Sequence, residues 1–407
     1  MKKQDTIHLN IASDIGNGFT KVAINQERMP LQPSLIAHIP DTAHPVMQAE
    51  STILSDLQNR LDITIKSDAV GLNGRYLVGQ SATTNAGASG YNISATPDKA
   101  HSDITIIMNI GMLVLYLLKQ HDPKQPLPHD FQVEVDNLAT ALPIIEASSQ
   151  QHCSDLTQRY LNKEHLVIVN NFDNPITFKI TFKRVSVISE GVVSNIGLLY
   201  DPIKHTYRTH DFFKKMQTYA QDPDKDTLKQ IANFTSKDIA SVGNIIGVDV
   251  GDGTVDISVL DDKLQSLHND QFIDKGIGSV IDTAIDILRT QKNIKFTSRQ
   301  AFLQQSLRND RRGAYYQSII KEQIPSLQNA ITEKLKTIFT NLNNDIGLIY
   351  FHGAGANVLA ETYVPQLKAF LNQFDQWGLV KVLWLDPNES QWLNLDGLML
   401  QVASMAK

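Results

Sequence analysis

The segment 247–260 constrains this chain more than any other feature of its sequence. Two apolar stretches flank a turn that contains Gly251 and Gly253, which predicts a β-hairpin. Glycine lets backbone amides approach a ligand closely, and successive amides of such a turn form a concavity that binds anions. Asp249, at the end of the first strand, would repel a phosphate unless a cation lay between them. We therefore expect Mg²⁺ there, held by Asp249 through water, although an ordinary hairpin would fit the segment equally well.

A second hairpin of the same design is predicted at 11–24. An apolar strand ends at Asp14, the turn contains Gly16 and Gly18, and another strand follows. Lys21 distinguishes this hairpin, because a lysine in that place can act as a point charge on the β- and γ-phosphates of a nucleotide. Two such hairpins far apart in one chain indicate two similar half-domains whose turns grip the phosphates of one nucleotide.

Residues 14–21 resemble the first phosphate loop of the actin superfamily, 249–254 resemble the second, and 348–357 resemble its adenosine motif. The motifs occur in the family's order, and the resemblance extends from about Ile7 to about Leu400. It implies an α/β, ribonuclease H-like ATPase fold of two lobes, each a mixed sheet flanked by helices with an outer insertion subdomain. It also implies ATP, or alternatively GTP, together with Mg²⁺ as cofactors.

The resemblance also implies a division of the chain. The expected parts are a first lobe at 1–200 with an outer insertion at about 26–100, a polar connector at 201–244, a second lobe at 245–390 with an insertion at about 275–345, and a C-terminal helix at 391–407 packed on the first lobe. The segment 205–237 departs from the family pattern. Its polar, partly helical composition favours a solvated surface excursion over a contact site for filaments or an adaptor.

Apolar periodicity and turn residues predict the elements between the motifs. We expect helices at 102–120 and 144–161, and a strand at 346–351 followed by a helix that begins near Asn357. The segment 104–118 is the most apolar of the chain, but it is short for a membrane span and contains Asn109, so we expect a buried helix.

Glu190 follows a predicted strand and begins a predicted helix. The family resemblance implies that a carboxylate or amide at this place holds the water that attacks the γ-phosphate, so Glu190 is the expected catalytic residue. The alternative is an acidic residue favoured at a helix N-terminus by the helix dipole.

The remaining expected site residues also come from the resemblance. Asp14 and Asp249 are expected at the metal, each through water, and Asp249 is expected to take part in catalysis. Lys321 and Glu322 are plausible members of the adenine pocket wall. The full set of expected cofactor-binding residues is Asp14, Gly16, Asn17, Gly18, Phe19, Thr20, Lys21, Gly251, Asp252, Gly253, Thr254, Gly276, Gly278, Lys321, Glu322, Gly353, Ala354, Gly355, Ala356 and Asn357.

Composition narrows the function classes. The 407 residues carry a formal net charge of −6 without a basic block, which disfavours direct nucleic-acid binding through a large basic surface. A single cysteine, Cys153, allows no internal disulfide framework, as expected in a reducing cytoplasm. The first residues lack the apolar run of a signal peptide, and we expect no membrane contact.

The expected function is that of a filament-forming actin-like ATPase. Subunits would stack head to tail when ATP binds, through a heterologous contact that does not close on itself, and would separate after hydrolysis. A DNA-binding adaptor would connect the filament to a plasmid or other DNA cargo. The alternatives are a small-molecule kinase that uses Asp252 or Asp256 as its base, a chaperone-like ATPase, and a membrane-tethered scaffold that binds ATP without hydrolysing it.

Overall fold

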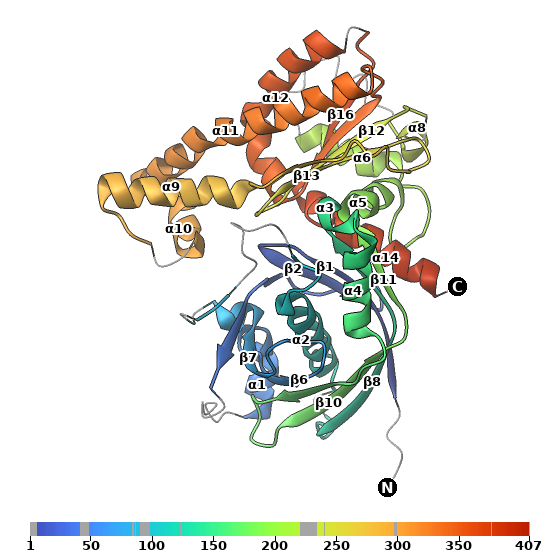
Figure 1. The fold of residues 1–407 in the computed structure, drawn as a ribbon. Coiled ribbons are helices and arrows are strands. Elements are labelled where there is room, and N and C mark those ends of the chain that lie inside the picture. The colour runs from blue at the N-terminus through green and yellow to red at the C-terminus, as the bar shows by residue number, and fades with distance from the viewer. Residues whose placement is uncertain are drawn as a thin grey trace. The chain divides into compact units, whose positions relative to one another are not determined.

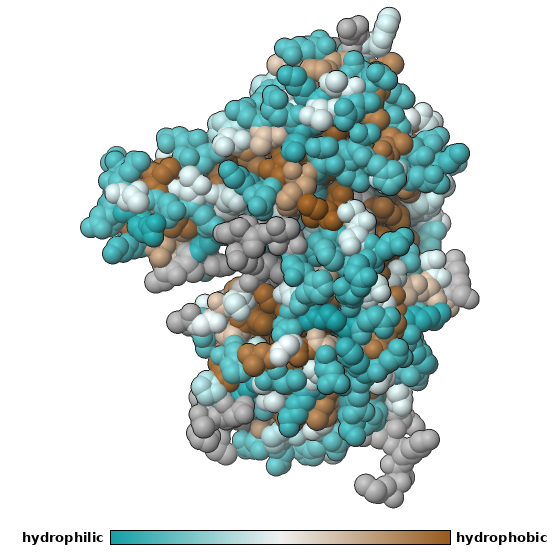
Figure 2. Space-filling model, in the orientation of Figure 1, coloured by the Kyte–Doolittle hydropathy of each residue, from teal (hydrophilic) through white to brown (hydrophobic). Residues whose placement is uncertain are grey.

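The computed structural model describes residues 6–40, 49–83, 85, 87–89, 98–122, 124–219, 234–239, 241–296, 299–375 and 377–406. The chain forms two compact units (Figure 1). Unit 1 comprises Met1–Thr206 and Asn394–Lys407, and unit 2 comprises Tyr207–Leu393. The connector expected at 201–244 is therefore shared between the units, with its larger part in unit 2. On the face that Figure 2 shows, hydrophilic residues dominate the surface of each unit.

Unit 1 contains a mixed sheet of eleven strands within the described residues, in the order β3-β2-β1-β8-β10-β9-β6-β7-β5, with β11 beside β8 and β4 beside β2. The outer strands β5 to β7 continue this sheet through the β6–β9 pairing. The strands are β1 Ile7–Ile15, β2 Phe19–Ile24, β3 Glu27–Arg28, β4 Gln32–Pro33, β5 Ile36–Ile39, β6 Asp62–Lys66, β7 Gly74–Val78, β8 Asp130–Leu142, β9 His165–Val169, β10 Ile176–Phe182 and β11 Val185–Ser189. The helices are α1 Glu50–Asp56, α2 Asp103–Lys119, α3 Ile144–Ala147, α4 Gln150–Tyr160, α5 Glu190–Leu199 and α14 Leu393–Met405.

Helix α2 is the centre of the unit 1 core. Every residue from Ile104 to Leu118 is buried, which confirms the prediction of a buried helix, and Figure 1 shows the sheet curving around it. A helix that is apolar on all sides needs such complete coverage. Its one buried amide, Asn109, accepts a hydrogen bond from Ser13 on β1 and donates one of 2.5 Å to the Tyr160 hydroxyl. These bonds fix α2 and α4 against the strand that leads into the first glycine turn.

The helix expected at 144–161 is interrupted. Helix α3 ends at Ala147, and α4 begins at Gln150 after Ser149, whose hydroxyl accepts a hydrogen bond from the His152 amide. Serine is a favoured N-cap because its oxygen satisfies an amide that has no partner within the helix. None of the helices in the described ranges combines the length and the hydropathy that crossing a bilayer requires.

Unit 2 contains a five-stranded sheet in the order β14-β13-β12-β15-β16, in which β12, β15 and β16 are parallel. Its strands are β12 Ile245–Val250, β13 Val255–Leu260, β14 Gln271–Ile273, β15 Leu348–His352 and β16 Lys381–Trp384. Its helices are α6 His210–Tyr219, α8 Ser236–Ile239, α9 Ile277–Lys292, α10 Arg299–Ser306, α11 Arg311–Asn341, α12 Ala354–Phe374 and α13 Pro387–Ser390.

Helix α6 lies in the segment expected to be a solvated excursion, but its apolar side is part of unit 2. Phe212, Phe213 and Met216 are all buried, and the Phe213 ring packs edge-on against Phe234 with centroids 5.3 Å apart. The apolar side of α6 is therefore packed, whereas His205, Lys214 and Lys215 of the same segment are exposed. Most of the rest, residues 220–233, lies outside the described residues.

The C-terminal helix α14 packs on α5 within unit 1 through a glycine. A Cβ atom at Gly397 would lie 1.9 Å from the Val193 carbonyl oxygen, so only glycine permits this approach. We expect Gly397→Val to lower the free energy of unfolding by about 1–3 kcal/mol, the range typical of overpacking. Ser404→Val, at an exposed position of the same helix, is the matched control. Equal urea midpoints for the two variants would contradict this account of the α5–α14 contact.

Candidate functional site

The first glycine turn joins β1 to β2, as predicted. Asp14 and Lys21 are directly opposite each other on the two strands, so their side chains share one face of the sheet. Lys21 Nζ lies 2.6 Å from Asp14 Oδ2, and the Asp14 side chain is almost fully buried. The turn itself is closed by a hydrogen bond of 3.0 Å from the Gly16 amide to the Phe19 carbonyl.

The second glycine turn, between β12 and β13, repeats this geometry. The Gly251 amide donates a hydrogen bond of 2.9 Å to the Thr254 carbonyl. A Cβ atom at Gly16 or at Gly251 would lie 3.1 Å from the carbonyl oxygen that closes its own turn. Among the described residues, the amides at the two tips, those of Asn17, Gly18, Asp252 and Gly253, have no hydrogen-bond partner. Each turn therefore presents two adjacent amides, the arrangement that binds anions.

Two other residues expected in the first turn have different surroundings. Phe19 is 49% exposed, whereas Thr20 is buried. The Thr20 hydroxyl shares a hydrogen bond of 2.9 Å with the Ser34 hydroxyl, and the Ser34 amide donates one of 3.1 Å to the Gly18 carbonyl. Thr20 and Ser34 thus support the turn from inside the unit. The role of Ser34 could not be predicted from residue spacing, because its contact with Thr20 depends on the pairing of β4 with β2.

Gly276 and Gly278 bring the start of α9 against the second turn. The amides of Ile277 and Gly278 donate hydrogen bonds of 3.0 and 2.8 Å to the carbonyls of Gly251 and Asp252. A Cβ atom at Gly276 would lie 2.5 Å from the Gly251 carbonyl oxygen. Both glycines therefore shape the turn from behind, through close backbone packing.

The Asp252 carboxylate, at the tip of the second turn, is paired with a residue that sequence reasoning missed. Arg299, the first residue of α10, lies 2.6 Å from Asp252 and also binds Asp282 on α9. Burial lowers the pKa of the Arg299 guanidinium, but the hydrogen bonds and charges of Asp282 and Asp252 outweigh burial and raise it. Asp252 thus anchors its turn to α9 and α10.

Asp249 lies at the carboxyl end of β12, opposite His352 at the end of the parallel strand β15. The two side chains approach each other, with His352 Nδ1 3.8 Å from Asp249 Oδ1. The adjacent Gly353 adopts a φ of +86°, and a Cβ atom there would lie 2.3 Å from Asp249 Oδ1. Ligand sites of open α/β sheets gather at the carboxyl ends of parallel strands, where Asp249, the second turn and the start of α12 meet.

Helix α12 begins at Ala354, and the prediction that it begins near Asn357 is wrong by three residues. The expected adenosine residues Ala354, Gly355, Ala356 and Asn357 therefore form its first turn. Gly355 and Ala356 are buried and Ala354 is exposed. The positive end of the helix dipole consequently lies next to Asp249.

Gly353 and Gly378 offer a comparison between backbone strain and crowding. Both have positive φ, +86° and +63°, but a Cβ atom at Gly378 would meet nothing within 4 Å. We expect Gly378→Ala to lower the free energy of unfolding by about 1 kcal/mol, and Gly353→Ala to lower it by at least about 2 kcal/mol, because crowding against Asp249 adds to the strain. Thermal unfolding compares the two variants. Equal losses of unfolding free energy in the two variants would show that Asp249 does not crowd a side chain at position 353.

Glu190 begins α5 at the carboxyl end of β11. Strands β1 and β11 are both parallel to β8, so Glu190 and the first glycine turn lie at the same edge of the unit 1 sheet. The Glu190 side chain is buried, and its Oε1 accepts a hydrogen bond of 3.0 Å from Lys99 Nζ. Sequence reasoning missed Lys99, because no spacing relates it to Glu190.

Lys321 and Glu322 are exposed on α11. Their exposure does not test whether they bind adenine, so their place in an adenine pocket stays a prediction. Within the described residues, three possible metal ligands approach one another at His8, Glu134 and Asp136. The Lys183 side chain forms ion pairs with both of these half-buried carboxylates and so offsets part of their charge.

Comparison with known proteins agrees with this geometry. Residues 12–192 match the family described as actin like proteins N terminal domain. The actin-like protein Alp7A superposes with a TM-score of 0.66 at 14% identity, covering 98% of this chain and 97% of that chain. A 15-stranded ParM filament from Clostridium botulinum gives 0.61 at 16% identity, with 98% and 100% covered. Bacillus thuringiensis ParM with ATP gives 0.60 at 14% identity, with 98% and 99% covered.

No curated protein sequence matches the chain. The family match covers the first glycine turn and Glu190, and the structural matches extend over nearly the whole chain, including the second turn. The mixed sheets of both units agree with the α/β fold expected from the sequence. The chain therefore has the fold of the actin-like proteins, and its residues 12–192 match the family of their N-terminal domain.

Proposed function

We propose that this protein binds one Mg²⁺–ATP per chain in a manner that depends on both glycine turns, and that it hydrolyses the ATP. The observation that carries the proposal is the shared geometry of the turns. Each turn is closed by the same type of backbone hydrogen bond and presents two adjacent amides at its tip. In each turn, a Cβ atom on the first glycine would lie 3.1 Å from the carbonyl oxygen that closes the turn. The Bacillus thuringiensis ParM that shares this fold was solved with ATP.

The donor set suits the proposed ligand. Carboxylate oxygens and water are the ligands that Mg²⁺ prefers, and Asp14 and Asp249 are each the second-last residue of a strand that leads into a glycine turn. Bound Mg²⁺ would neutralise phosphate charge. Lys21, which pairs with Asp14, can also supply a point charge to the phosphates. Glu190 would hold the attacking water, and the first turn of α12 would supply residues that bind the adenosine.

We further propose that ATP binding drives self-association into filaments and that hydrolysis loosens them. The support is the fold, which is shared with a ParM that forms a 15-stranded filament. Identical head-to-tail contacts propagate without closing, so one surface pair suffices for a polymer. A DNA-binding adaptor would attach a plasmid or another cargo. The cytoplasm, which supplies ATP, is the proposed location.

A small-molecule kinase is the second candidate, but the site favours it less. Both carboxylates that could act as its base already have protein partners. Asp252 pairs with Arg299 at 2.6 Å, and Asp256 is buried and accepts a hydrogen bond of 3.1 Å from the Thr254 hydroxyl. A general base must instead reach the proton of its substrate.

Sedimentation and electron microscopy of the purified chain test the proposed function. We expect filaments above a critical concentration with Mg²⁺–ATP, and monomers with ADP or without nucleotide. A non-hydrolysable ATP analogue should give filaments that persist. A chain that stays monomeric in ATP at high concentration under varied salt would contradict filament formation, and sugar-stimulated ATP turnover by such a monomer would favour the kinase.

A further inference from the structure

We infer that Lys99 is a positioning residue that holds the Glu190 carboxylate for ATP hydrolysis. This inference rests on the proposed function of Glu190. The Lys99 and Glu190 side chains are only 6% and 9% exposed, and Nζ lies 3.0 Å from Oε1. A carboxylate that positions water must itself be held, because a displacement of about 1 Å can reduce a rate by about 10²-fold.

The backbone of Lys99 is fixed by a second buried carboxylate. The two oxygens of Glu146 accept hydrogen bonds of 3.0 Å from the Lys99 and Ala100 amides. The Lys99 carbonyl accepts a bond of 2.7 Å from the Thr105 hydroxyl on α2. The amide and the carbonyl of Lys99 are therefore both hydrogen-bonded. Its ammonium group contacts Glu190 from a backbone position that is fixed on both sides.

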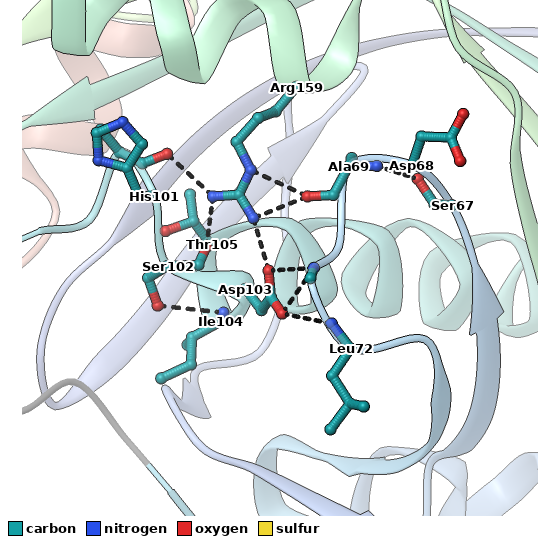
Figure 3. A network of polar contacts seen from close by, with 12 residues as sticks. Ser67, Asp68, Ala69, Leu72, His101, Ser102, Asp103, Ile104, Thr105 and Arg159 are labelled. Carbon is teal, nitrogen blue, oxygen red and sulfur yellow. Dashed lines mark hydrogen bonds and ion pairs between the residues drawn. The ribbon is translucent and has the colours of Figure 1, made fainter.

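Arg159 on α4 extends this support to the outer strands (Figure 3). Its guanidinium donates to the carbonyls of Ala100 and Ser102 and to the carbonyl of Ala69, in the segment between β6 and β7. It also donates a hydrogen bond of 2.8 Å to Asp103, whose carboxylate accepts hydrogen bonds from the amides of Gly71 and Leu72. Glu146 and Arg159 therefore both fix the segment before α2. This support distinguishes Lys99 from a lysine on a mobile surface segment.

The chemistry explains why a lysine suits this position. A buried carboxylate without a partner pays a large desolvation penalty and changes conformation or protonation to avoid it. An ammonium on one oxygen holds the carboxylate in one orientation relative to the water that it is proposed to position. Lys99 acts on hydrolysis only through Glu190, so its effect must disappear when Glu190 is changed.

Four full-length variants test this inference through single-turnover ATP hydrolysis and ATP affinity. Lys99→Met is expected to slow hydrolysis by about 10²-fold with ATP affinity close to that of the wild type. Glu190→Gln should slow it at least as much. The double variant should hydrolyse ATP no more slowly than Glu190→Gln, because residues that act as a unit are not additive. Arg75→Met breaks the equally buried Arg75–Asp62 pair and should leave hydrolysis unchanged.

The outcomes separate the two proposals. Unchanged hydrolysis in Glu190→Gln would overturn the proposed function of Glu190. Slow hydrolysis in Glu190→Gln together with a wild-type rate in Lys99→Met would overturn only the role of Lys99, as would effects that multiply in the double variant. If Lys99→Met does not fold, the hydrolysis rate of Lys99→Arg tests the inference instead. Its guanidinium keeps the charge but displaces the carboxylate, so a wild-type rate would contradict the inference.

Discussion

Replacing Glu190 with glutamine is expected to slow ATP hydrolysis by about 10²–10⁴-fold, the range in which a positioned general base contributes. Glutamine keeps the size of the side chain and can still contact Lys99, but it cannot take a proton. ATP affinity should remain close to that of the wild type, because Glu190 is proposed to bind the attacking water and not the nucleotide. Filaments should then persist in ATP. Phosphate release and light scattering measure the two effects.

The alternative explanation for Glu190, a favourable charge at a helix N-terminus, predicts a different result. In that case the substitution would change stability by up to about 2 kcal/mol, as for a charge in a partly buried position, and would leave hydrolysis intact. Glu50→Gln is the matched control, because Glu50 is the first residue of α1 and is exposed. A Glu190→Gln variant that turns over ATP as fast as Glu50→Gln would exclude the catalytic assignment.

Replacing Asp249 with asparagine is expected to weaken Mg²⁺-dependent ATP binding by about 10–100-fold, as is typical for a residue that orients metal-bound water. Asparagine has nearly the same shape, so the contacts with Gly353 and His352 persist while the negative charge is lost. Removing Mg²⁺ with a chelator should reduce wild-type affinity to the level of the variant and should change the variant little.

Asp262→Asn controls for the loss of one negative charge near the same hairpin, because Asp262 follows β13 and is exposed. It should retain the Mg²⁺ dependence of the wild type. If the Asp249 variant keeps both its ATP affinity and its response to the chelator, Asp249 is not at the metal. Fluorescence titration with labelled ATP, with and without Mg²⁺, makes both comparisons.

The parts of the fold that depend on local chemistry could be predicted from the sequence. Asp14 with Gly16 and Gly18, and Asp249 with Gly251 and Gly253, define strand ends and turns through spacing alone. The two hairpins are therefore where they were expected. Helix α2 was predictable because its apolar residues leave no polar face.

Other parts depended on contacts that no spacing reveals. The start of α12 was misplaced because Gly355 is a poor helix former by intrinsic propensity. The residue before the helix, Gly353, packs against Asp249 and Val250, and no spacing in the sequence reveals that contact. Arg299 and Lys99 reach Asp252 and Glu190 from segments 47 and 91 residues away in the chain. Such partners become visible only when the sheets bring their elements together.

Calorimetric titration of Mg²⁺–ATP into the wild type, Lys21→Met and Gly276→Val tests the central claim, the joint dependence of one nucleotide on both turns. Lys21→Met removes a charge at the first turn, and Gly276→Val pushes a side chain into the backbone of the second. We predict one ATP per wild-type chain and an affinity at least about tenfold weaker in each variant, which is a loss of about 1.4 kcal/mol. Unaltered affinity in either folded variant, or two independent ATP sites per chain, would contradict the account.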